Sequence, residues 1–185
     1  AGTAGRPFDV RRNGFVIGEG AAVLVLESAA HAAARHATAY AEWIAGGLLA
    51  DAAGLTHLDP SGAGLTRLIR DVLARGRTSF DAVDYINLHG TATPKNDEVE
   101  AAVVADSFAA RTRASSSKGW TGHTLGAAGI LEAVICLIAL QHGFVPGTLN
   151  CEQLDPLCGP QLALGNESAD VRVALSNSFG FGGSN

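Results

Sequence analysis

The chain has 185 residues, of which 47% are hydrophobic and 17% are charged, and its formal net charge at pH 7 is −5. This composition is typical of a folded α/β protein with a large core and excludes a disordered chain. The negative net charge gives no general electrostatic reason to bind nucleic acid or an anionic membrane, although a local basic patch for an acidic partner is compatible with it.

The first half of the chain alternates strand-like and helix-like patterns. Residues 14–27 predict two strands interrupted by glycines, and the alanine-rich stretch 28–36 predicts a helix. Residues 40–49 predict another strand, and the Asp, Gly, Pro and Ser content of 51–62 predicts a loop. Apolar residues at helical spacing predict an amphipathic helix over 63–75.

The second half continues the alternation, which argues for a layered α/β architecture. We expect a strand at 83–88, a helix from about 97 to 109, an apolar helix from about 124 to 142 and a closing strand at 171–176. The most apolar run is shorter than the roughly 20 residues that a bilayer needs, and it carries Glu132. We therefore expect a buried core helix and no membrane span.

The three cysteines, at positions 136, 151 and 158, show neither zinc-ligand spacing nor a disulfide framework. An odd count without disulfide spacing fits a reducing compartment, so we expect a cytoplasmic protein with no bound metal. Cys136 lies in an apolar run and is expected to be a small buried hydrophobe. None of the three sits in a strand-to-helix turn that would expose and activate a thiolate.

Two histidines stand out from the six in the chain. His89 comes at the end of the predicted strand 83–88, and His123 opens the long apolar helix, with Lys118 five residues before it. This is the layout of an active site without a nucleophile. The other four histidines lack such a context and are expected to be surface or capping residues: His31, His36, His57 and His142.

Four segments of the chain resemble the β-ketoacyl-[acyl carrier protein] synthases, in the order that the family shows. They are Arg-Pro-Phe-Asp at 6–9 running into Gly-Phe-Val-Ile-Gly-Glu-Gly-Ala at 14–21, His-Gly-Thr-Ala-Thr-Pro at 89–94, Lys-Gly-Trp-Thr-Gly-His-Thr-Leu-Gly-Ala-Ala-Gly at 118–129 and Asn-Ser-Phe-Gly-Phe-Gly-Gly at 177–183. The resemblance covers nearly all the chain but only about the second half of such a synthase.

The resemblance implies a thiolase-like layered αβαβα fold. Residues 1–28 would end the N-terminal half, and 29–185 would form the C-terminal half, truncated before its last strand. The nucleophilic cysteine would lie upstream of Ala1, so we expect a fragment that is inactive alone.

The implied activity is a decarboxylative Claisen condensation of an acyl thioester with malonyl-acyl carrier protein, in fatty acid, polyketide or polyene synthesis. The implied partner is acyl carrier protein, whose phosphopantetheine arm carries the substrate, and no bound cofactor is expected. The full-length enzyme would be a homodimer, or a heterodimer with a related subunit.

The resemblance implies that His89 and His123 assist decarboxylation. Two neutral N–H donors aimed at one oxygen stabilise an enolate, and losing one such donor typically costs about 3 kcal/mol. Lys118 would belong to the same network, where its ammonium disfavours protonation of the imidazoles. Glu132 would pair with Lys118, because an unpaired charge inside an apolar helix is costly to bury. The alternative is a carboxylate solvated at a crevice.

Thr91 and Thr93 match family threonines that hydrogen-bond the phosphopantetheine arm. Their hydroxyls would point the same way if the segment is extended. The alternative is a turn ahead of a helix capped by Asn96 or Asp97. Asp97 is carried over as a supporting residue, although Asn96 stands where many family members have glycine.

The glycine-rich end lacks the G-x-G-x-x-G dinucleotide fingerprint. In the resembling enzymes it is a mobile loop that also includes Phe179. The residue matching Phe181 gates the acyl pocket and lends a backbone N–H to the thioester. Flanking glycines would allow that motion, and a plain tight turn is the alternative.

Two rival functions remain to be weighed. Ser115 and Lys118 form an S-x-x-K pattern, the nucleophile signature of penicillin-binding proteins, but its companions S-D-N and K-T-G are absent. The second rival is a non-catalytic partner subunit resembling a chain-length factor. The residue at the upstream nucleophile position distinguishes this rival from an enzyme.

Overall fold

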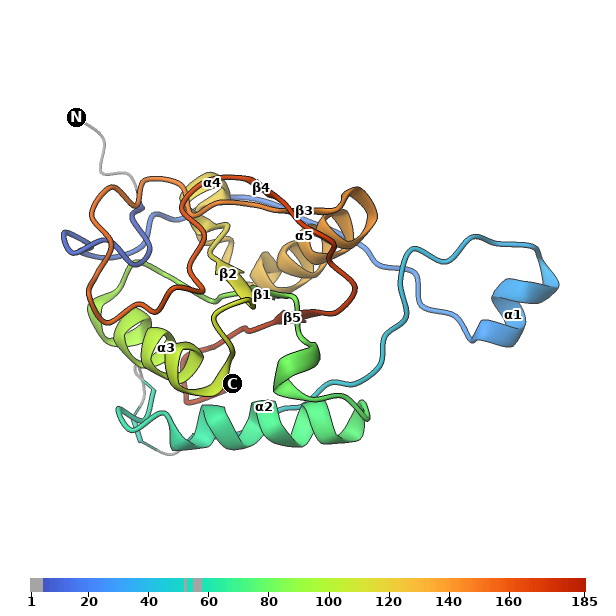
Figure 1. Ribbon diagram of the computed structural model, residues 1–185, viewed down its shortest axis with the longest axis horizontal. Helices are drawn as coiled ribbons and strands as arrows, with labels where there is room; N and C mark the ends of the chain where they lie inside the picture. Colours follow the sequence, from blue (N-terminus) through green and yellow to red (C-terminus); the bar gives the residue numbers. More distant parts are fainter. Residues whose placement is uncertain (1–4, 52, 55–57) are drawn as a thin grey trace.

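The computed structural model describes residues 5–51, 53–54 and 58–185, and its centre is a three-stranded parallel sheet in the order β2-β1-β5 (Figure 1). A two-stranded antiparallel sheet, β3-β4, lies beside it, and β3 contacts β2. The strands are Tyr85–Asn87 (β1), Arg113–Ser115 (β2), Phe144–Val145 (β3), Glu167–Ser168 (β4) and Ala174–Ser176 (β5).

Helices cover both faces of the central sheet (Figure 1). Side chains alternate along a strand, and so Ile86 of β1 packs in a core cluster with α2 and α3, while Tyr85 packs in another with α5. The helices are Ala29–Ala34 (α1), Ala63–Arg75 (α2), Pro94–Ser107 (α3), Lys118–Thr121 (α4) and Ala128–His142 (α5), with 3₁₀ turns at Phe80–Ala82 and Leu125–Ala127.

The sequence pattern predicted the helices of the core well. α2 has the predicted bounds and buries Leu65, Ile69 and Leu73 along one stripe. α3 begins three residues before the predicted start of 97, because a proline fits the first helical position, where no N–H partner is needed. Strands β1 and β5 fall inside the predicted ranges 83–88 and 171–176.

The apolar helix α5 is a core helix, as expected, and it is buried along one stripe. Ala128, Glu132, Cys136 and Ala139 are buried, whereas Ile138 is 39% exposed. The stretch Leu125–His142 is long and apolar enough to cross a membrane by length and composition. Its contacts with β1 and β5 and its buried carboxylate are those of a core helix.

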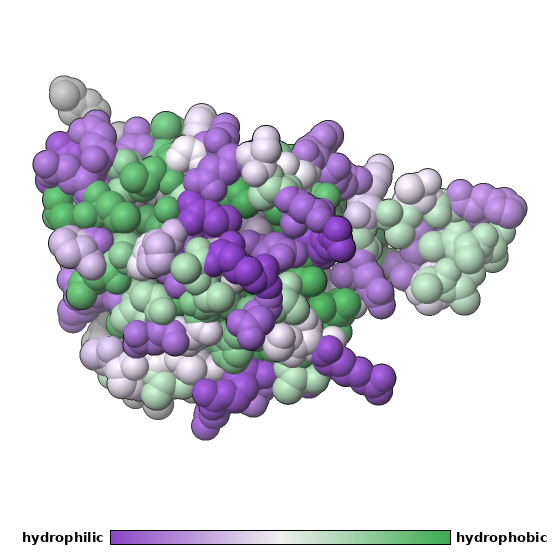
Figure 2. All heavy atoms as spheres, in the orientation of Figure 1, coloured by the Kyte–Doolittle hydropathy of each residue, from purple (hydrophilic) through white to green (hydrophobic). Residues whose placement is uncertain are grey.

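The predicted strands at 14–27 and 40–49 are wrong for this structure. Outside an isolated bridge between Ile17 and His123 these residues form irregular chain, and the lobe that carries α1 stands away from the sheet (Figures 1 and 2). Val23 and Val25 are 86% and 83% exposed. A strand needs a neighbouring backbone, and among the described residues these segments have one only at their ends.

Residues 6–12 are packed into the layered part of the molecule, unlike the segment that follows them. Phe8 is 1% exposed and lies in the same core cluster as α2 and α3. Asp9 is fully buried, and its carboxylate accepts hydrogen bonds at 2.8 Å from the backbone N–H groups of Glu152 and Gln153. The predicted division at residue 28 stays a prediction.

Candidate active site

His89 lies two residues after the end of the buried strand β1, so the sheet fixes the position of its backbone. The strand has a parallel neighbour on each side, and the Leu88 N–H donates to the Ser115 carbonyl at 2.8 Å. His89 itself is 5% exposed. The carboxyl ends of parallel strands are where open α/β sheets place their functional groups.

The turn formed by His89 and Gly90 has a partner for each of its backbone polar groups. The two N–H groups donate to the two carboxylate oxygens of Glu100, each at 2.8 Å. The His89 carbonyl accepts from Lys118 Nζ, and the Gly90 carbonyl accepts from Ser116 Oγ at 2.7 Å. A Cβ at position 90 would lie 2.5 Å from Cβ of Ser116, at a φ of +35°, so glycine is required there.

His123 is held by α4 and by the segment near the start of the chain. Its N–H donates to the Val16 carbonyl at 2.7 Å, and its carbonyl accepts from the Gly18 N–H at 3.1 Å. The two backbones approach so closely that a Cβ on Gly18 would lie 2.0 Å from the Thr121 carbonyl oxygen. The structure thereby brings the two histidines together from distant parts of the chain.

The rings of His89 and His123 meet edge to face, with centroids 5.3 Å apart and planes at 85°. Lys118 Nζ lies 3.4 Å from Nδ1 of His89, and the Leu125 N–H donates to Nδ1 of His123 at 3.3 Å. An Nδ1 that accepts a hydrogen bond carries no proton, so these partners assign the proton of each neutral ring to Nε2. Each ring therefore has one N–H donor, and the described residues include no hydrogen-bond partner for it.

Burial lowers the pKa of both histidines, and the charge of Lys118 lowers it further. The pKa of His89 falls well below its ordinary value, and that of His123 falls to about 4. Desolvation is the larger cause for both rings, so the predicted effect of the lysine is real but secondary. Both imidazoles are neutral donors near pH 7.

Lys118 and Glu132 form a buried ion pair beside His89. They are 4% and 2% exposed, and the Glu132 carboxylate also accepts from Ser178 Oγ at 3.4 Å. Burial raises the pKa of Glu132, while the lysine and the serine oppose that rise. The structure thus contains the predicted pairing and places it against the first histidine.

Thr91 and Thr93 lie next to each other, with their hydroxyl oxygens 2.9 Å apart. The segment is not extended, because Ala92 has a φ of +64° and the chain turns there. The turn nevertheless places the two hydroxyls side by side. Thr93 is the N-cap residue of α3, which excludes the alternative in which Asn96 or Asp97 caps the helix.

Asp97 faces the N-terminal segment. It is 1% exposed, accepts from the Phe8 N–H at 2.8 Å and lies 4.0 Å from Arg12 Nε. Burial raises its pKa to about 6, against the effect of these partners. Its described contacts anchor residues 6–12 and do not include the rings of the histidine pair.

The two phenylalanines of the glycine-rich end have different surroundings. The ring centroid of Phe179 lies 5.0 Å from that of His89, whereas Phe181 is 72% exposed. Gly183 contacts the chain at Asp51, and a Cβ there would lie 1.8 Å from the carbonyl oxygen of that residue. Phe179 therefore packs at the histidine pair, as does Phe15, whose ring centroid lies 5.3 Å from that of His123.

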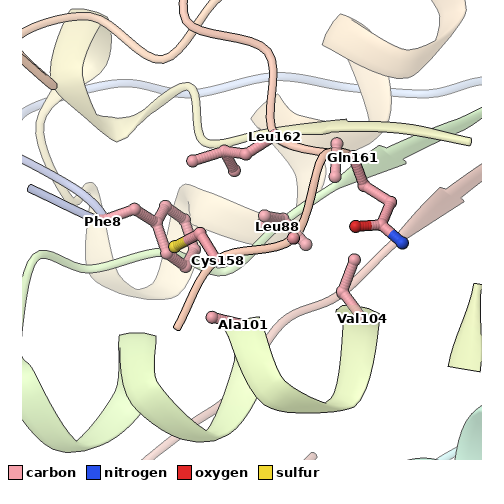
Figure 3. A pocket seen from close by; sticks show the side chains of 9 residues that line it. Phe8, Leu88, Ala101, Val104, Cys158, Gln161 and Leu162 are labelled. Carbon is pink, nitrogen blue, oxygen red and sulfur yellow. The ribbon is translucent and has the colours of Figure 1, made fainter. Parts of the chain in front are cut away.

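The other reactive side chains are poorly suited to act as nucleophiles. Burial raises the pKa of each of the three cysteines to about 12. Cys158 lines a cavity of about 10 Å³ between Phe8 and Gln161, room for one water molecule at most (Figure 3). Ser115 is fully buried and hydrogen-bonded to the Tyr85 hydroxyl at 3.0 Å, which excludes the S-x-x-K hydrolase function.

The remaining histidines lie away from the site. His31, His36 and His142 are exposed, as expected for surface or capping residues. His57 lies outside the described residues.

Sequence reasoning missed Glu100 and its partner Asn177. Glu100 is fully buried, and its Oε1 also accepts from Asn177 Nδ2 at 3.1 Å. Burial raises the pKa of Glu100 to about 7, although its three hydrogen-bond donors oppose the shift. Helical spacing could have identified this residue, because it lies four positions before Val104 on the buried side of α3.

Comparisons with known proteins agree with this geometry. Residues 40–152 match the family model described as the C-terminal domain of β-ketoacyl synthase. The chain is 43% identical over 187 residues to 3-oxoacyl-[acyl-carrier-protein] synthase 2 of Coxiella burnetii, covering 98% of this chain and 45% of that protein. It therefore spans less than half the length of this curated relative.

Solved structures give the same result. The ishigamide ketosynthase/chain length factor matches with a TM-score of 0.93 and 40% identity, over 100% of this chain and 46% of that one. A ketosynthase structure containing its type II polyketide acyl-carrier protein and a bound hexaketide matches with a TM-score of 0.91 and 33% identity, over 98% and 45% of the two chains. These matches confirm the predicted α/β, thiolase-like fold.

Proposed function

Because this chain belongs to the β-ketoacyl synthase family, we propose that it carries the decarboxylation site of an acyltransferase that condenses an acyl thioester with malonyl-acyl carrier protein. The observation that carries the proposal is the histidine pair. His89 and His123 are neutral, share one site and each hold the proton on Nε2.

Decarboxylation breaks the bond between the carboxylate carbon and the α-carbon of the malonyl group. Carbon dioxide leaves, and the electron pair spreads over the α-carbon and the thioester oxygen as an enolate. Two N–H donors on that oxygen stabilise the charge as it develops, and neutral imidazoles are poor acids that do not protonate the carbanion. Lys118 supports the pair by holding His89 at Nδ1 and at its backbone carbonyl.

Condensation also needs an acyl group on a nucleophile. Each cysteine of this chain has its pKa raised to about 12, so none is a ready thiolate near pH 7. We therefore assign the acyl-accepting cysteine to polypeptide outside these 185 residues. The carbanion would attack its thioester carbonyl, and the cysteine thiolate would leave.

Acyl carrier protein is the proposed partner, with its phosphopantetheine arm as the substrate carrier. Support comes from the similar ketosynthase that was solved with its acyl-carrier protein. The adjacent hydroxyls of Thr91 and Thr93 are donors suited to the amides of such an arm. We propose a cytoplasmic dimer, and the similarity to a ketosynthase/chain length factor structure favours considering a heterodimer as well.

A chain-length-factor-like subunit is the second candidate, and the same structural similarity favours it. The retained histidines, the lysine and its buried glutamate favour the catalytic subunit instead. A non-catalytic partner has no use for two neutral donors in one site.

The proposal is tested in the natural polypeptide that contains these 185 residues. Release of carbon dioxide from malonyl-acyl carrier protein is measured beside transfer of an acyl chain onto the enzyme. His123→Ala should slow decarboxylation by roughly 100-fold, the cost of about 3 kcal/mol for one lost donor, and slow acyl transfer far less.

The matched control is His142→Ala, which removes an exposed histidine at the end of α5. It should leave both half-reactions unchanged. Equal losses of both half-reactions in His123→Ala would contradict the assignment. A parent protein that releases no carbon dioxide would favour the non-catalytic subunit.

A further inference from the structure

A surface cleft lies between α2 and α3, two helices that contact each other in the layered part of the molecule (Figure 1). Its volume is about 420 Å³, within the roughly 300–1,000 Å³ that small-molecule sites occupy. The residues of α3 that line it begin at Ala102, roughly 14 Å along the helix axis from Thr93 at 1.5 Å per residue. The cleft is therefore separate from the histidine pair, and no step of the proposed reaction uses it.

The cleft exists because the side chains between the two helices are short. Where α2 begins, the helices are in close contact, and a Cβ on Gly62 would lie 2.5 Å from Cγ2 of Val103. Further along, the lining side chains include Thr66, Ala102 and Ser107. These three are too small to fill the space that longer side chains would occupy in a packed helix pair.

The floor of the cleft is apolar and held in place by the core. Val103 is 5% exposed and belongs to the core cluster of α2 and α3. Phe80 packs edge to face against the buried ring of Phe108, with centroids 5.0 Å apart and planes at 64°. The floor therefore offers a fixed apolar surface to the body of a ligand.

The rim of the cleft carries one charge of each sign, on different helices. Arg70 of α2 and Asp106 of α3 both line the cleft and are both exposed, and no ion pair joins these two described residues. The hydroxyl of Ser61, also on the rim, is already engaged, because it donates to Asp59 Oδ2 at 2.7 Å. The guanidinium and the carboxylate are thus the charged groups that the rim presents to a ligand.

We propose that this cleft binds a small zwitterion with an apolar body, of the size of a free amino acid. The carboxylate of the ligand binds the guanidinium fork of Arg70, its ammonium group binds Asp106, and its side chain lies on Phe80 and Val103. A ligand with a single negative charge is repelled by Asp106, and one with a single positive charge is repelled by Arg70. Only a ligand with both charges satisfies the two sides of the rim.

The test measures binding of L-phenylalanine to the natural polypeptide by calorimetric titration. We expect a Kd of about 1 mM, the affinity of a small ligand that fits an open cleft. The ligands 3-phenylpropionate and 2-phenylethylamine keep the ring but lack one charge each. Both should bind at least about tenfold more weakly, the usual effect of losing a hydrogen bond to a charged group.

Substitutions on the rim identify the site. Arg70→Gln and Asp106→Asn should each weaken binding of L-phenylalanine by roughly tenfold or more. Arg67→Gln and Asp71→Asn are the matched controls, because they remove exposed charges of α2 that do not line the cleft. Parental affinity in both rim variants would overturn the inference.

Filling the cleft gives a second variant that does not depend on charge. Ala102→Phe places a ring in the cleft from an exposed position of α3 and should abolish binding. Ala74→Phe makes the same change at an exposed position of α2 outside the cleft and should bind as the parent does. Binding by Ala102→Phe with parental affinity would place the ligand elsewhere and overturn the inference.

Two results with the parent would also refute the zwitterion site. One is the absence of binding at about 10 mM L-phenylalanine, well above the expected Kd. The other is equal affinity for L-phenylalanine and 3-phenylpropionate, which would mean that Asp106 takes no part. Because binding is measured directly, these results do not depend on release of carbon dioxide, and failure of the proposed function is distinguished from failure of this inference.

Discussion

The layered part of the molecule and the segment at 19–48 contain the same kinds of residue in opposite surroundings. Val83, just before β1, and Ile86 within it are fully buried, whereas Val23 and Val25 are more than four-fifths exposed. Both stretches have the composition of strands, but only the first has parallel neighbours on each side. Strand propensity reports how well a side chain fits a covered, pleated surface, and a partner must supply that surface.

The functional groups follow the same division. His89, Lys118 and Glu132 are held inside the layered part by several contacts each. His123 lies at the boundary, because its backbone pairs with residues 16–18, just before the exposed segment. The position of His89 is therefore fixed by the layered part, whereas the position of His123 also depends on residues 16–18.

Among substitutions at the candidate site, breaking the buried ion pair should have the largest effect on stability. Lys118→Ala leaves Glu132 buried without its partner, and we expect the free energy of unfolding to fall by about 3–5 kcal/mol, measured by denaturant titration of the natural polypeptide. Lys95→Ala, an exposed lysine on α3, is the control and should stay within about 0.5 kcal/mol of the parent. A loss below about 1 kcal/mol for Lys118→Ala would mean that Glu132 is solvated.

Phe181→Ala should have an intermediate effect, confined to selectivity. We propose this exposed ring as the gate of the acyl pocket, so its removal should shift the product distribution over a series of acyl donors while stability changes by about 0.5 kcal/mol or less. Phe179→Ala offers a contrast, because that ring packs against His89 and its loss should slow decarboxylation. An unchanged product profile in Phe181→Ala would make it a surface residue without a gating role.

The smallest effect is expected from Val25→Lys in the 185-residue chain. The side chain is 83% exposed, so unfolding should change by about 0.5 kcal/mol or less. Val83→Lys, the same change at a fully buried position, should prevent folding. In the natural polypeptide Val25→Lys should be clearly destabilising if a neighbouring strand covers the segment. An equal change in the free energy of unfolding in the 185-residue chain and in the natural polypeptide would show that no strand does.

Secondary structure was predicted correctly from the sequence where the pattern and the packing involve residues close together in the chain. The helix at 63–75 was predictable because Leu65, Ile69 and Leu73 lie on one side of their own helix. The strands predicted at 14–27 and 40–49 do not form in this structure. Strand pairing depends on two segments, and the sequence pattern of one segment does not show whether a partner lies beside it. β3 and β4 are two residues long, too short to produce a periodic pattern.

The candidate site shows the same limit. His89, His123 and Lys118 could be singled out because each is a polar residue beside an apolar element. Helical spacing marks Glu100 as buried, but its hydrogen bond to Asn177 joins residues 77 positions apart, and no local pattern reveals that partner. The tautomers of the two rings likewise follow from partners that only the structure provides.

The pairing of His123 with residues 16–18 bears on how hybrid synthases could be assembled from related parents. The predicted division at residue 28 would place Ile17 on one parent and His123 on the other, although the two form a bridge with backbones in close contact around Gly18. Asp9 and Phe8 also have hydrogen-bond partners beyond residue 90. A recombination junction that preserves the donor geometry belongs before Arg6, so that these contacts are inherited from one parent.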